Sequence, residues 1–194
     1  MSEFLYFFKE GFFHVLDWQA YDHVLFFIVL IIAYTFDDWK RILTLVTLFT
    51  LGHTVSLFLA VYDIVSVNSK LVEFLIPITI LITALFNVFT AKNTTKQDKI
   101  GVLYTTTAFF GLIHGLGFSS YFDMISSASD YKALSILEFA LGIEVSQIIV
   151  VLIVLIISFL VQTIFRFSKR DWILVVSSIV IGMVIPMIIS SKIW

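Results

Sequence analysis

The sequence predicts an all-α integral membrane protein, a polytopic bundle of six transmembrane helices forming a single domain over residues 1–194. The chain has 194 residues, of which 60% are hydrophobic and only 13% charged, with a mean hydropathy of +1.04. A soluble domain of this length cannot bury so much apolar surface. The apolar runs are continuous rather than alternating, which favours helices over a barrel. Short polar loops join the runs, and they predict one compact unit.

The stretch Met1–Ala20 mixes aromatic and charged residues. This mixture predicts an amphipathic helix at the membrane interface, with Trp18 at headgroup depth. The first span is expected over about 21–36. Because that run is short for a bilayer, its helix is expected to begin earlier, near Phe12 or Asp17.

Five further apolar runs predict the remaining spans, and they lie at about 42–62, 71–90, 100–122, 133–165 and 172–193. The fifth span is too long for a straight crossing and is expected to tilt or protrude. Pro77 is expected to kink the third span. Lysine and arginine concentrate in the loops after the first, third and fifth spans, which predicts that these loops are cytoplasmic and both termini outside. These residues are Lys40, Arg41, Lys92, Lys96, Lys99, Arg166, Lys169 and Arg170.

Ionisable side chains inside the apolar runs are the candidate functional residues, since burying them in lipid is costly without a partner. The run Phe109–Phe118 places His114 among three glycines. Gly111 and Gly117 share the helix face of His114, so they allow another helix to approach closely. The alternative interpretation of a lone intramembrane histidine is a hydrogen bond between helices.

Depth in the membrane relates this histidine to other polar residues. With the predicted orientation and about 1.5 Å of rise per residue, His53, His114 and Glu144 lie roughly 12–15 Å below the outer face. That level is near the middle of a hydrocarbon core of about 30 Å. Three polar groups on three helices at one depth can converge on one site, whereas Asp22 and His23 are expected higher, near the outer mouth.

The chemistry of these residues indicates a metal site. The chain has no cysteine, which excludes thiolate ligands, and its net charge of −2 argues against a nucleic-acid partner. Imidazole and carboxylate ligands suit divalent Ni, Co, Zn, Fe or Mn. The predicted ligands are Asp22, His23, His53, His114 and Glu144. Two further residues are interpreted otherwise, His14 as interfacial and Glu138 as near the surface.

Four stretches of the chain resemble the HupE/UreJ family of membrane proteins. Tyr21–Phe26 is similar to its Asp-His-x-Leu-Phe stretch, and Thr50–Leu57 to its Thr-x-Gly-His-Ser-x-Thr-Leu stretch. Phe110–Phe118 is similar to Phe-Gly-x-x-His-Gly-x-Gly-Phe, and Leu141–Gln147 to Gly-Val-Glu-x-Gly-Gln. The stretches occur in family order over most of the chain. One departure is Ala140, which stands where the family often has Asn.

The resemblance implies a small helical permease of a bacterial-type inner membrane, associated with nickel and sometimes cobalt supply. On this interpretation the protein carries a divalent ion, Ni or Co with Zn as a further candidate, from outside to the cytoplasm. An alternative stays open, in which the histidines hold Zn²⁺ with one free position and Glu144 acts as the base of a membrane-embedded hydrolase. A transporter is favoured over an enzyme, and the oligomeric state is left open.

Overall fold

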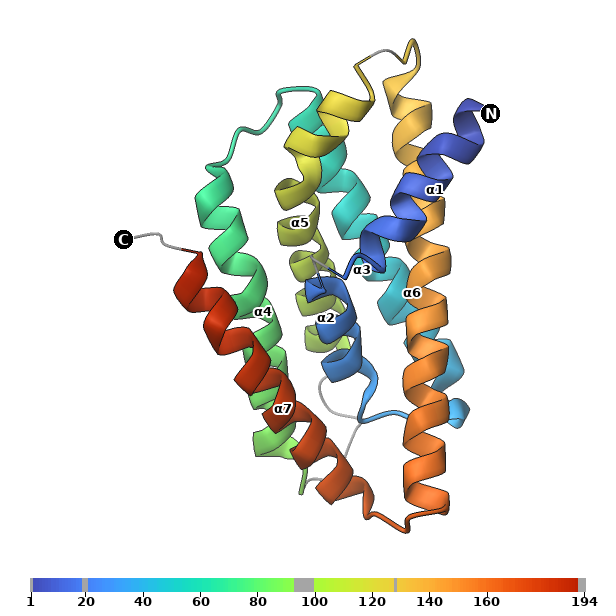
Figure 1. Cartoon of the computed structure of the whole chain (residues 1–194), viewed down its shortest axis with the longest axis vertical. Coiled ribbons are helices and arrows are strands. Elements are labelled where there is room, and N and C mark those ends of the chain that lie inside the picture. The colour runs from blue at the N-terminus through green and yellow to red at the C-terminus, as the bar shows by residue number, and fades with distance from the viewer. Residues whose placement is uncertain (1, 19–20, 93–99, 128, 192–194) are drawn as a thin grey trace.

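The computed structural model describes residues 2–18, 21–92, 100–127 and 129–191, and these residues form an all-helical bundle (Figure 1). Five of its helices are long and apolar enough to cross a membrane within the described residues, so the prediction of an α-helical membrane protein is confirmed. Lys96 and Lys99, two of the residues that predicted the orientation, lie outside the described part. In chain order the elements are α1 (Glu3–Val15), α2 (Asp22–Ile31), the 3-10 turn η1 (Phe36–Asp38), α3 (Trp39–Val61), α4 (Ser69–Thr90), α5 (Ile100–Ile125), α6 (Lys132–Thr163) and α7 (Lys169–Ser190).

The first predicted span is not one continuous helix. The chain instead forms two short helices, α1 of 13 residues and α2 of 10 residues, and Figure 1 shows α2 continuing below α1. At about 1.5 Å per residue, neither helix reaches across a hydrocarbon core of about 30 Å. Six unbroken spans are therefore not found among the described residues.

The N-terminal helix packs along α6, which corrects the prediction of a helix lying at the interface. Its residues Phe7, Gly11 and Val15 are buried. The approach to α6 is backbone to backbone, because a Cβ at Gly11 would fall on the carbonyl oxygen of Phe139. A Cβ at Gly142 of α6 would fall in the same way on α1. A glycine on each helix thus lets α1 enter the bundle.

A second close crossing joins α3 and α5, the helices that carry His53 and His114. A Cβ at Gly111 would fall on the carbonyl oxygen of Phe49, and one at Gly115 on that of His53. The predicted close approach at Gly111 is therefore confirmed, whereas Gly117 meets a side chain of α4 instead. Small residues at this crossing bring the backbones of the two histidine-bearing helices together.

The remaining helices complete the bundle around this pair. The helix α6 has 32 residues, which at about 1.5 Å per residue exceeds the hydrocarbon thickness, as the length of its apolar run predicts. The helix α4 continues through Pro77, and α7 continues through Pro186. Trp172 of α7 donates its indole N–H to Ser158 Oγ of α6 at 2.9 Å. Figure 1 shows α4 and α7 side by side along one flank of the bundle.

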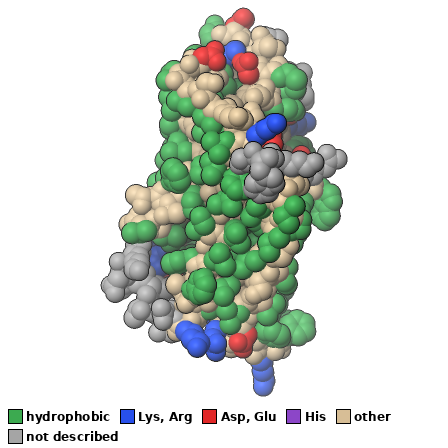
Figure 2. Space-filling view, turned by 90° about the vertical axis from the view of Figure 1, so that its left-hand side faces the viewer, with side chains coloured by type: hydrophobic (Ala, Val, Ile, Leu, Met, Phe, Trp, Pro, Cys, Tyr) green, Lys and Arg blue, Asp and Glu red, His purple; other side chains and the backbone are tan. Residues whose placement is uncertain are grey.

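The surface agrees with a membrane setting. On the face shown in Figure 2, hydrophobic side chains cover the middle, and charged side chains gather mainly at the two ends. Large apolar side chains are exposed on the long helices, for example Phe89, Leu137 and Ile179. Such exposure over helices of this length is what a lipid environment accommodates.

Candidate metal centre

Three imidazoles lie close together near the facing ends of α1 and α2. His14 lies at the end of α1, His23 at the start of α2, and His53 in the middle of α3. Each offers a ring nitrogen, and these three atoms all lie within 4.8 Å of one another. The ring centroids are 4.6 Å apart for His14 and His23, and 5.9 Å apart for His23 and His53. Three nitrogen donors at this spacing can hold a metal ion after small side-chain movements.

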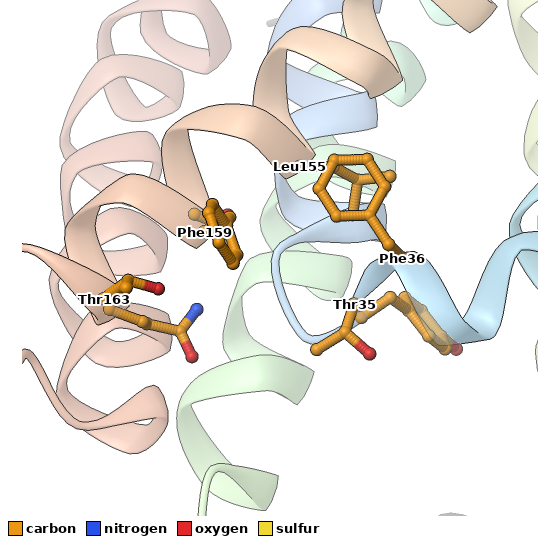
Figure 3. A pocket seen from close by; sticks show the side chains of 8 residues that line it. Thr35, Phe36, Leu155, Phe159 and Thr163 are labelled. Atoms are coloured by element: carbon orange, nitrogen blue, oxygen red, sulfur yellow. The ribbon is translucent and has the colours of Figure 1, made fainter.

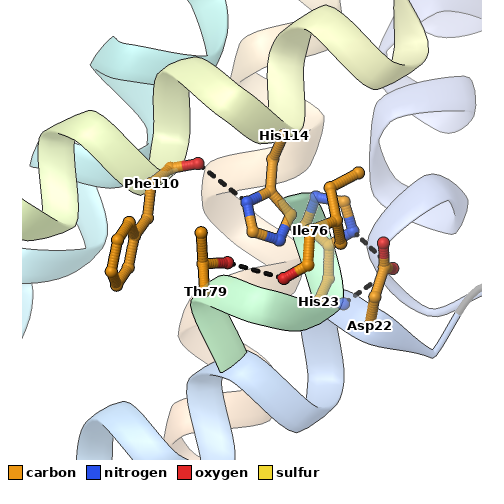
Figure 4. Close-up of polar contacts among 6 residues, drawn as sticks. All are labelled: Asp22, His23, Ile76, Thr79, Phe110 and His114. Carbon is orange, nitrogen blue, oxygen red and sulfur yellow. Dashed lines mark hydrogen bonds and ion pairs between the residues drawn. The ribbon is translucent and has the colours of Figure 1, made fainter. Parts of the chain in front are cut away.

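A fourth imidazole, His114 of α5, lies against this group. Its ring centroid is 5.1 Å from that of His23. Its Nδ1–H donates to the carbonyl oxygen of Phe110 at 2.7 Å (Figure 4). Because a carbonyl oxygen can only accept, the neutral ring carries its proton on Nδ1 and its lone pair on Nε2. The same hydrogen bond fixes the ring orientation, which is the arrangement found behind histidine ligands of metals.

Asp22 supports His23 in the same way. The Nδ1–H of His23 donates to Asp22 Oδ1 at 3.1 Å, and the backbone N–H of His23 donates to the same oxygen at 2.8 Å (Figure 4). The carboxylate therefore holds the ring, and Nε2 is left with the lone pair. A carboxylate, a histidine and a metal in line make a recurrent arrangement that raises the basicity of the ligand.

Five buried ring nitrogens of these four histidines have no hydrogen-bond partner among the described residues. They are Nε2 of His14, His23, His53 and His114, together with Nδ1 of His53. The His23, His53 and His114 side chains are 2%, 0% and 1% exposed. An unpaired buried polar group costs about 1–3 kcal/mol. Four such imidazoles in one place are therefore unexpected in a site that serves packing alone.

Aromatic rings enclose the imidazole cluster, by which we mean His14, His23, His53 and His114. Phe49 packs on His114 with ring centroids 5.0 Å apart, and Phe26 packs on it at 5.5 Å. The ring centroid of Phe118 lies 3.9 Å from that of His14, and the ring centroid of Phe139 lies 6.3 Å from that of His53. This enclosure keeps water away, so an ion in the cluster would depend on the imidazoles for its ligands.

Glu144 lies apart from these imidazoles, on the seam between α6 and α3. Its Oε1 accepts from Thr47 Oγ1 at 2.6 Å. One turn further along both helices, Thr50 Oγ1 donates to Gln147 Oε1 at 2.9 Å. The second carboxylate oxygen of Glu144 is buried without a hydrogen-bond partner among the described residues. Glu144 follows Phe139 by five residues, or roughly 7 Å along the helix axis.

The structure thus rearranges the predicted ligand set. The ring centroid of His23 lies 5.9 Å from that of His53 and 5.1 Å from that of His114, whereas the sequence places His23 higher, near the mouth. Asp22 stands behind His23, and Glu144 contacts Thr47. The sequence estimate for His23 assumes one straight first span, whereas α1 and α2 are separate helices and His23 lies at the start of the second.

His14 is the member of the cluster that the sequence interpretation missed. Its interfacial assignment followed from the charged residues around it, and the structure instead turns it toward His23 and His53. A signal for it exists in the sequence. Gly11 precedes His14 by three residues, as Gly111 precedes His114, and both glycines lie against a neighbouring helix.

A pocket at the opposite end of α6 is separate from the imidazole cluster. It has a volume of about 160 Å³ and lies between the η1 turn and α6 (Figure 3). Thr35 and Phe36 line one side, and Leu155, Phe159 and Thr163 line the other. The absence of histidine from its lining distinguishes it from the metal candidate.

Comparison with known proteins identifies the family. A family model described as HupE / UreJ protein matches residues 1–191. The chain belongs to the HupE/UreJ family. Neither the curated proteins nor the solved structures gave a match. The predicted resemblance is therefore confirmed, and HupE/UreJ proteins are related to nickel and cobalt handling.

The family assignment and the geometry agree on one coarse conclusion. This HupE/UreJ chain is a helical membrane protein whose interior carries a histidine-rich candidate metal site. The donors are imidazole nitrogens supported by one carboxylate, a set that suits the later divalent transition metals better than magnesium or calcium.

Proposed function

We propose that this HupE/UreJ protein is a permease that binds a divalent transition-metal cation in the imidazole cluster and carries it across the membrane. Nickel or cobalt is the proposed cargo, and zinc is a further candidate. The observation that carries the proposal is the convergence of His14, His23 and His53, whose ligand atoms lie within 4.8 Å of one another while their Nε2 atoms have no partner among the described residues. His114 adds a fourth donor beside His23.

Asp22 and Glu144 take different parts in this proposal. Asp22 orients His23 and partly offsets the charge of the bound ion, which matters because an uncompensated dication in an apolar interior is strongly disfavoured. Glu144 receives the ion when it leaves the imidazoles. Its buried, unpartnered Oε2 and its place beyond Phe139 on α6 support this part.

The break between α1 and α2 supports transport over permanent binding. Discontinuous helices near the membrane midplane are a recurrent feature of transporter binding sites, and non-helical backbone at that depth is tolerated where it lines a site. Here the ends of two short helices carry His14 and His23. Ligands on helix ends can separate from the others without unfolding a long helix.

The proposed direction of transport is from the side of the N-terminus to the side of the η1 turn. Lys40 and Arg41 follow η1, and Arg166, Lys169 and Arg170 follow the end of α6. Figure 1 shows these segments at the end of the bundle opposite the N-terminus. Basic loops favour the cytoplasmic side of an inner membrane.

The test combines metal binding with flux. Purified protein is titrated with Ni²⁺, Co²⁺ and Zn²⁺ and then placed in liposomes for uptake measurements. We expect the wild type to bind and transport at least one of these ions, and His53→Ala to lose both properties. Glu144→Gln is expected to keep the affinity of the cluster and to slow uptake.

Two results would contradict the proposal. Equal binding and uptake by wild type, His53→Ala and His114→Ala would exclude the cluster as the site. A zinc ion that survives purification, with no flux of any metal in liposomes, would favour the membrane-embedded zinc hydrolase. A thermal unfolding measurement on each variant checks that a loss of binding is not a loss of folding.

A further inference from the structure

The face of α6 that α1 covers carries a second polar group, nearer the end of the bundle that holds the N-terminus. Ser135, Glu138 and Gly142 follow one another at helical-turn spacing, so they share this face. Gly142 lies directly against α1, since a Cβ there would meet the carbonyl oxygen of Phe8. Glu138, which the sequence places near the surface, is only 8% exposed under this helix.

Glu138 has an incomplete set of partners for a buried carboxylate. Its Oε2 is fully covered and has no hydrogen-bond partner among the described residues. The carboxylate of Glu3, at the start of α1, is close enough to repel its charge. Lys132, the basic residue nearest to it in sequence, pairs with Asp123 at 2.7 Å. Two neighbouring carboxylates are stabilised when a proton or a cation lies between them.

Hydroxyl groups extend this set of oxygen atoms. Ser129 Oγ donates to Glu3 Oε1 at 2.5 Å and lies 3.0 Å from Ser135 Oγ. Together with Glu138 these side chains offer only oxygen donors. Oxygen donors bind divalent cations that keep part of their water shell, and they discriminate weakly between metals. The imidazole cluster, by contrast, is enclosed by aromatic rings and requires a dehydrated ion.

Phe139 links these oxygen atoms to the imidazole cluster, because it is next to Glu138 in sequence and its ring contacts two of the histidines. Phe139 follows Glu138 on α6, and its ring lies 5.7 Å from that of His14 and 6.3 Å from that of His53. An ion held at Glu138 would therefore lie next to the residue whose ring contacts the cluster. Movement of Phe139 or of the end of α1 would connect the two places.

We propose that Glu138 and Glu3, with the hydroxyls of Ser129 and Ser135, form an entry station that captures a hydrated divalent cation before it passes to the imidazole cluster. This inference rests on the proposed permease function and adds a second site to it. The station raises the local concentration of the ion and loads the cluster, whereas affinity and selectivity at equilibrium belong to the histidines.

The experiment uses Mg²⁺ as a probe, because Mg²⁺ prefers oxygen donors and competes poorly for imidazole. Initial rates of Ni²⁺ uptake into proteoliposomes are measured with and without excess Mg²⁺. In the wild type we expect Mg²⁺ to inhibit uptake. In Glu138→Gln we expect the KM for Ni²⁺ to rise about tenfold at low ionic strength and the inhibition by Mg²⁺ to disappear. Equilibrium Ni²⁺ binding to the purified variant is expected to match the wild type.

Two further variants make the result specific. Asp123→Asn removes the same charge from the same end of the molecule, at a carboxylate paired with Lys132, and we expect uptake to stay as in the wild type. Glu3→Gln changes an exposed residue at the start of α1, so it tests the station without disturbing the packed face. It is expected to act in the same direction as Glu138→Gln, with a smaller change.

The outcomes separate this inference from the proposed function. If Glu138→Gln and Glu3→Gln both keep the KM and the Mg²⁺ inhibition of Asp123→Asn, the entry station is wrong and the permease stands. If Glu138→Gln fails to fold, Glu3→Gln decides alone. If the wild type itself neither binds nor transports Ni²⁺, Co²⁺ or Zn²⁺, the permease is overturned, and the entry station, which rests on it, is overturned with it.

Discussion

The four imidazoles are carried by two kinds of backbone. His53 and His114 lie within the long helices α3 and α5, whereas His14 and His23 lie at the facing ends of the short helices α1 and α2. The long pair is locked by glycines that bring the two backbones into contact. Neither short helix could cross a bilayer, and residues 16–18, which follow α1, are not helical.

We call His53 and His114, on α3 and α5, the fixed half of the candidate site. His14 and His23, on α1 and α2, are its movable half. Glycine contacts between backbones leave little freedom for α3 and α5 to slide, because protein interiors are close-packed. His14 and His23 instead lie at the ends of short helices, so a small rigid-body rotation of α1 or α2 can withdraw them from the other two imidazoles. A permease needs both properties, since its ligands must hold an ion and then let it go.

Among changes that leave all four histidines in place, the largest effect is expected from removing the residue that supports His23 in the movable half. In Asp22→Ala the His23 ring loses the acceptor for its Nδ1–H and the nearby negative charge. We expect the affinity for Ni²⁺ to fall by about 10–100-fold, the range found when partners of metal ligands are removed. Calorimetric titration measures it, with Asp37→Ala in the exposed η1 turn as the control. Unchanged affinity in Asp22→Ala would place His23 outside the coordination of the metal.

A side chain added at the crossing of α3 and α5 tests whether close backbone contact fixes this half of the site. The new methyl group of Gly115→Ala would meet the carbonyl oxygen of His53 and Ser56 Oγ, so α3 and α5 must separate. We expect the free energy of unfolding to fall by about 1–3 kcal/mol, as for overpacked cores, with weaker metal binding. Gly182→Ala on α7 is the matched control, because a Cβ at Gly182 has no neighbour within 4 Å. If the two variants unfold alike, the glycine crossing is not what fixes the pair.

The sequence predicted the fixed half better than the movable half. Continuous apolar runs locate α3 and α5, and glycines beside His114 indicate a close neighbour, so the meeting of His53 and His114 near one level follows from local patterns. The prediction for α6, 133–165, agrees closely with the observed Lys132–Thr163. Composition and helical periodicity are enough to predict these features.

The movable half depends on contacts between distant parts of the chain. The charged residues around His14 fit an interfacial helix equally well, and it is the contacts of Gly11 and Gly142 between α1 and α6 that bring that helix into the bundle. Once α1 packs against α6, His14 near its end lies beside His23 and His53, while Leu16, Asp17 and Trp18 directly after the helix stay exposed. The positions of His14 and His23 follow from that packing, which no local pattern specifies.

The smallest effect on Ni²⁺ affinity is expected from removing a hydrogen bond that holds α2 in place. The helix α2 has only 10 residues, a length at which an isolated helix is marginal. Asn87 of α4 donates its Nδ2–H to the carbonyl oxygen of Val29 in α2 at 2.5 Å. Asn87→Leu keeps the branch at Cγ and the number of side-chain heavy atoms and removes the donor, so we expect the free energy of unfolding to fall by about 1 kcal/mol. Because Val29 and His23 share one short helix, Ni²⁺ affinity should fall by a few fold.

The control for this change removes a hydrogen bond of α4 that does not reach α2. Thr83 Oγ1 donates to the carbonyl oxygen of Thr79 within α4, and Thr83→Val deletes it with almost no change in shape. We expect Thr83→Val to bind Ni²⁺ as the wild type does, in the same titration that measures Asn87→Leu. Equal affinities for the two variants would mean that burial alone positions α2. The movable half would then owe its resting geometry to packing, as the fixed half does, and the two halves would differ only in the continuity of their helices.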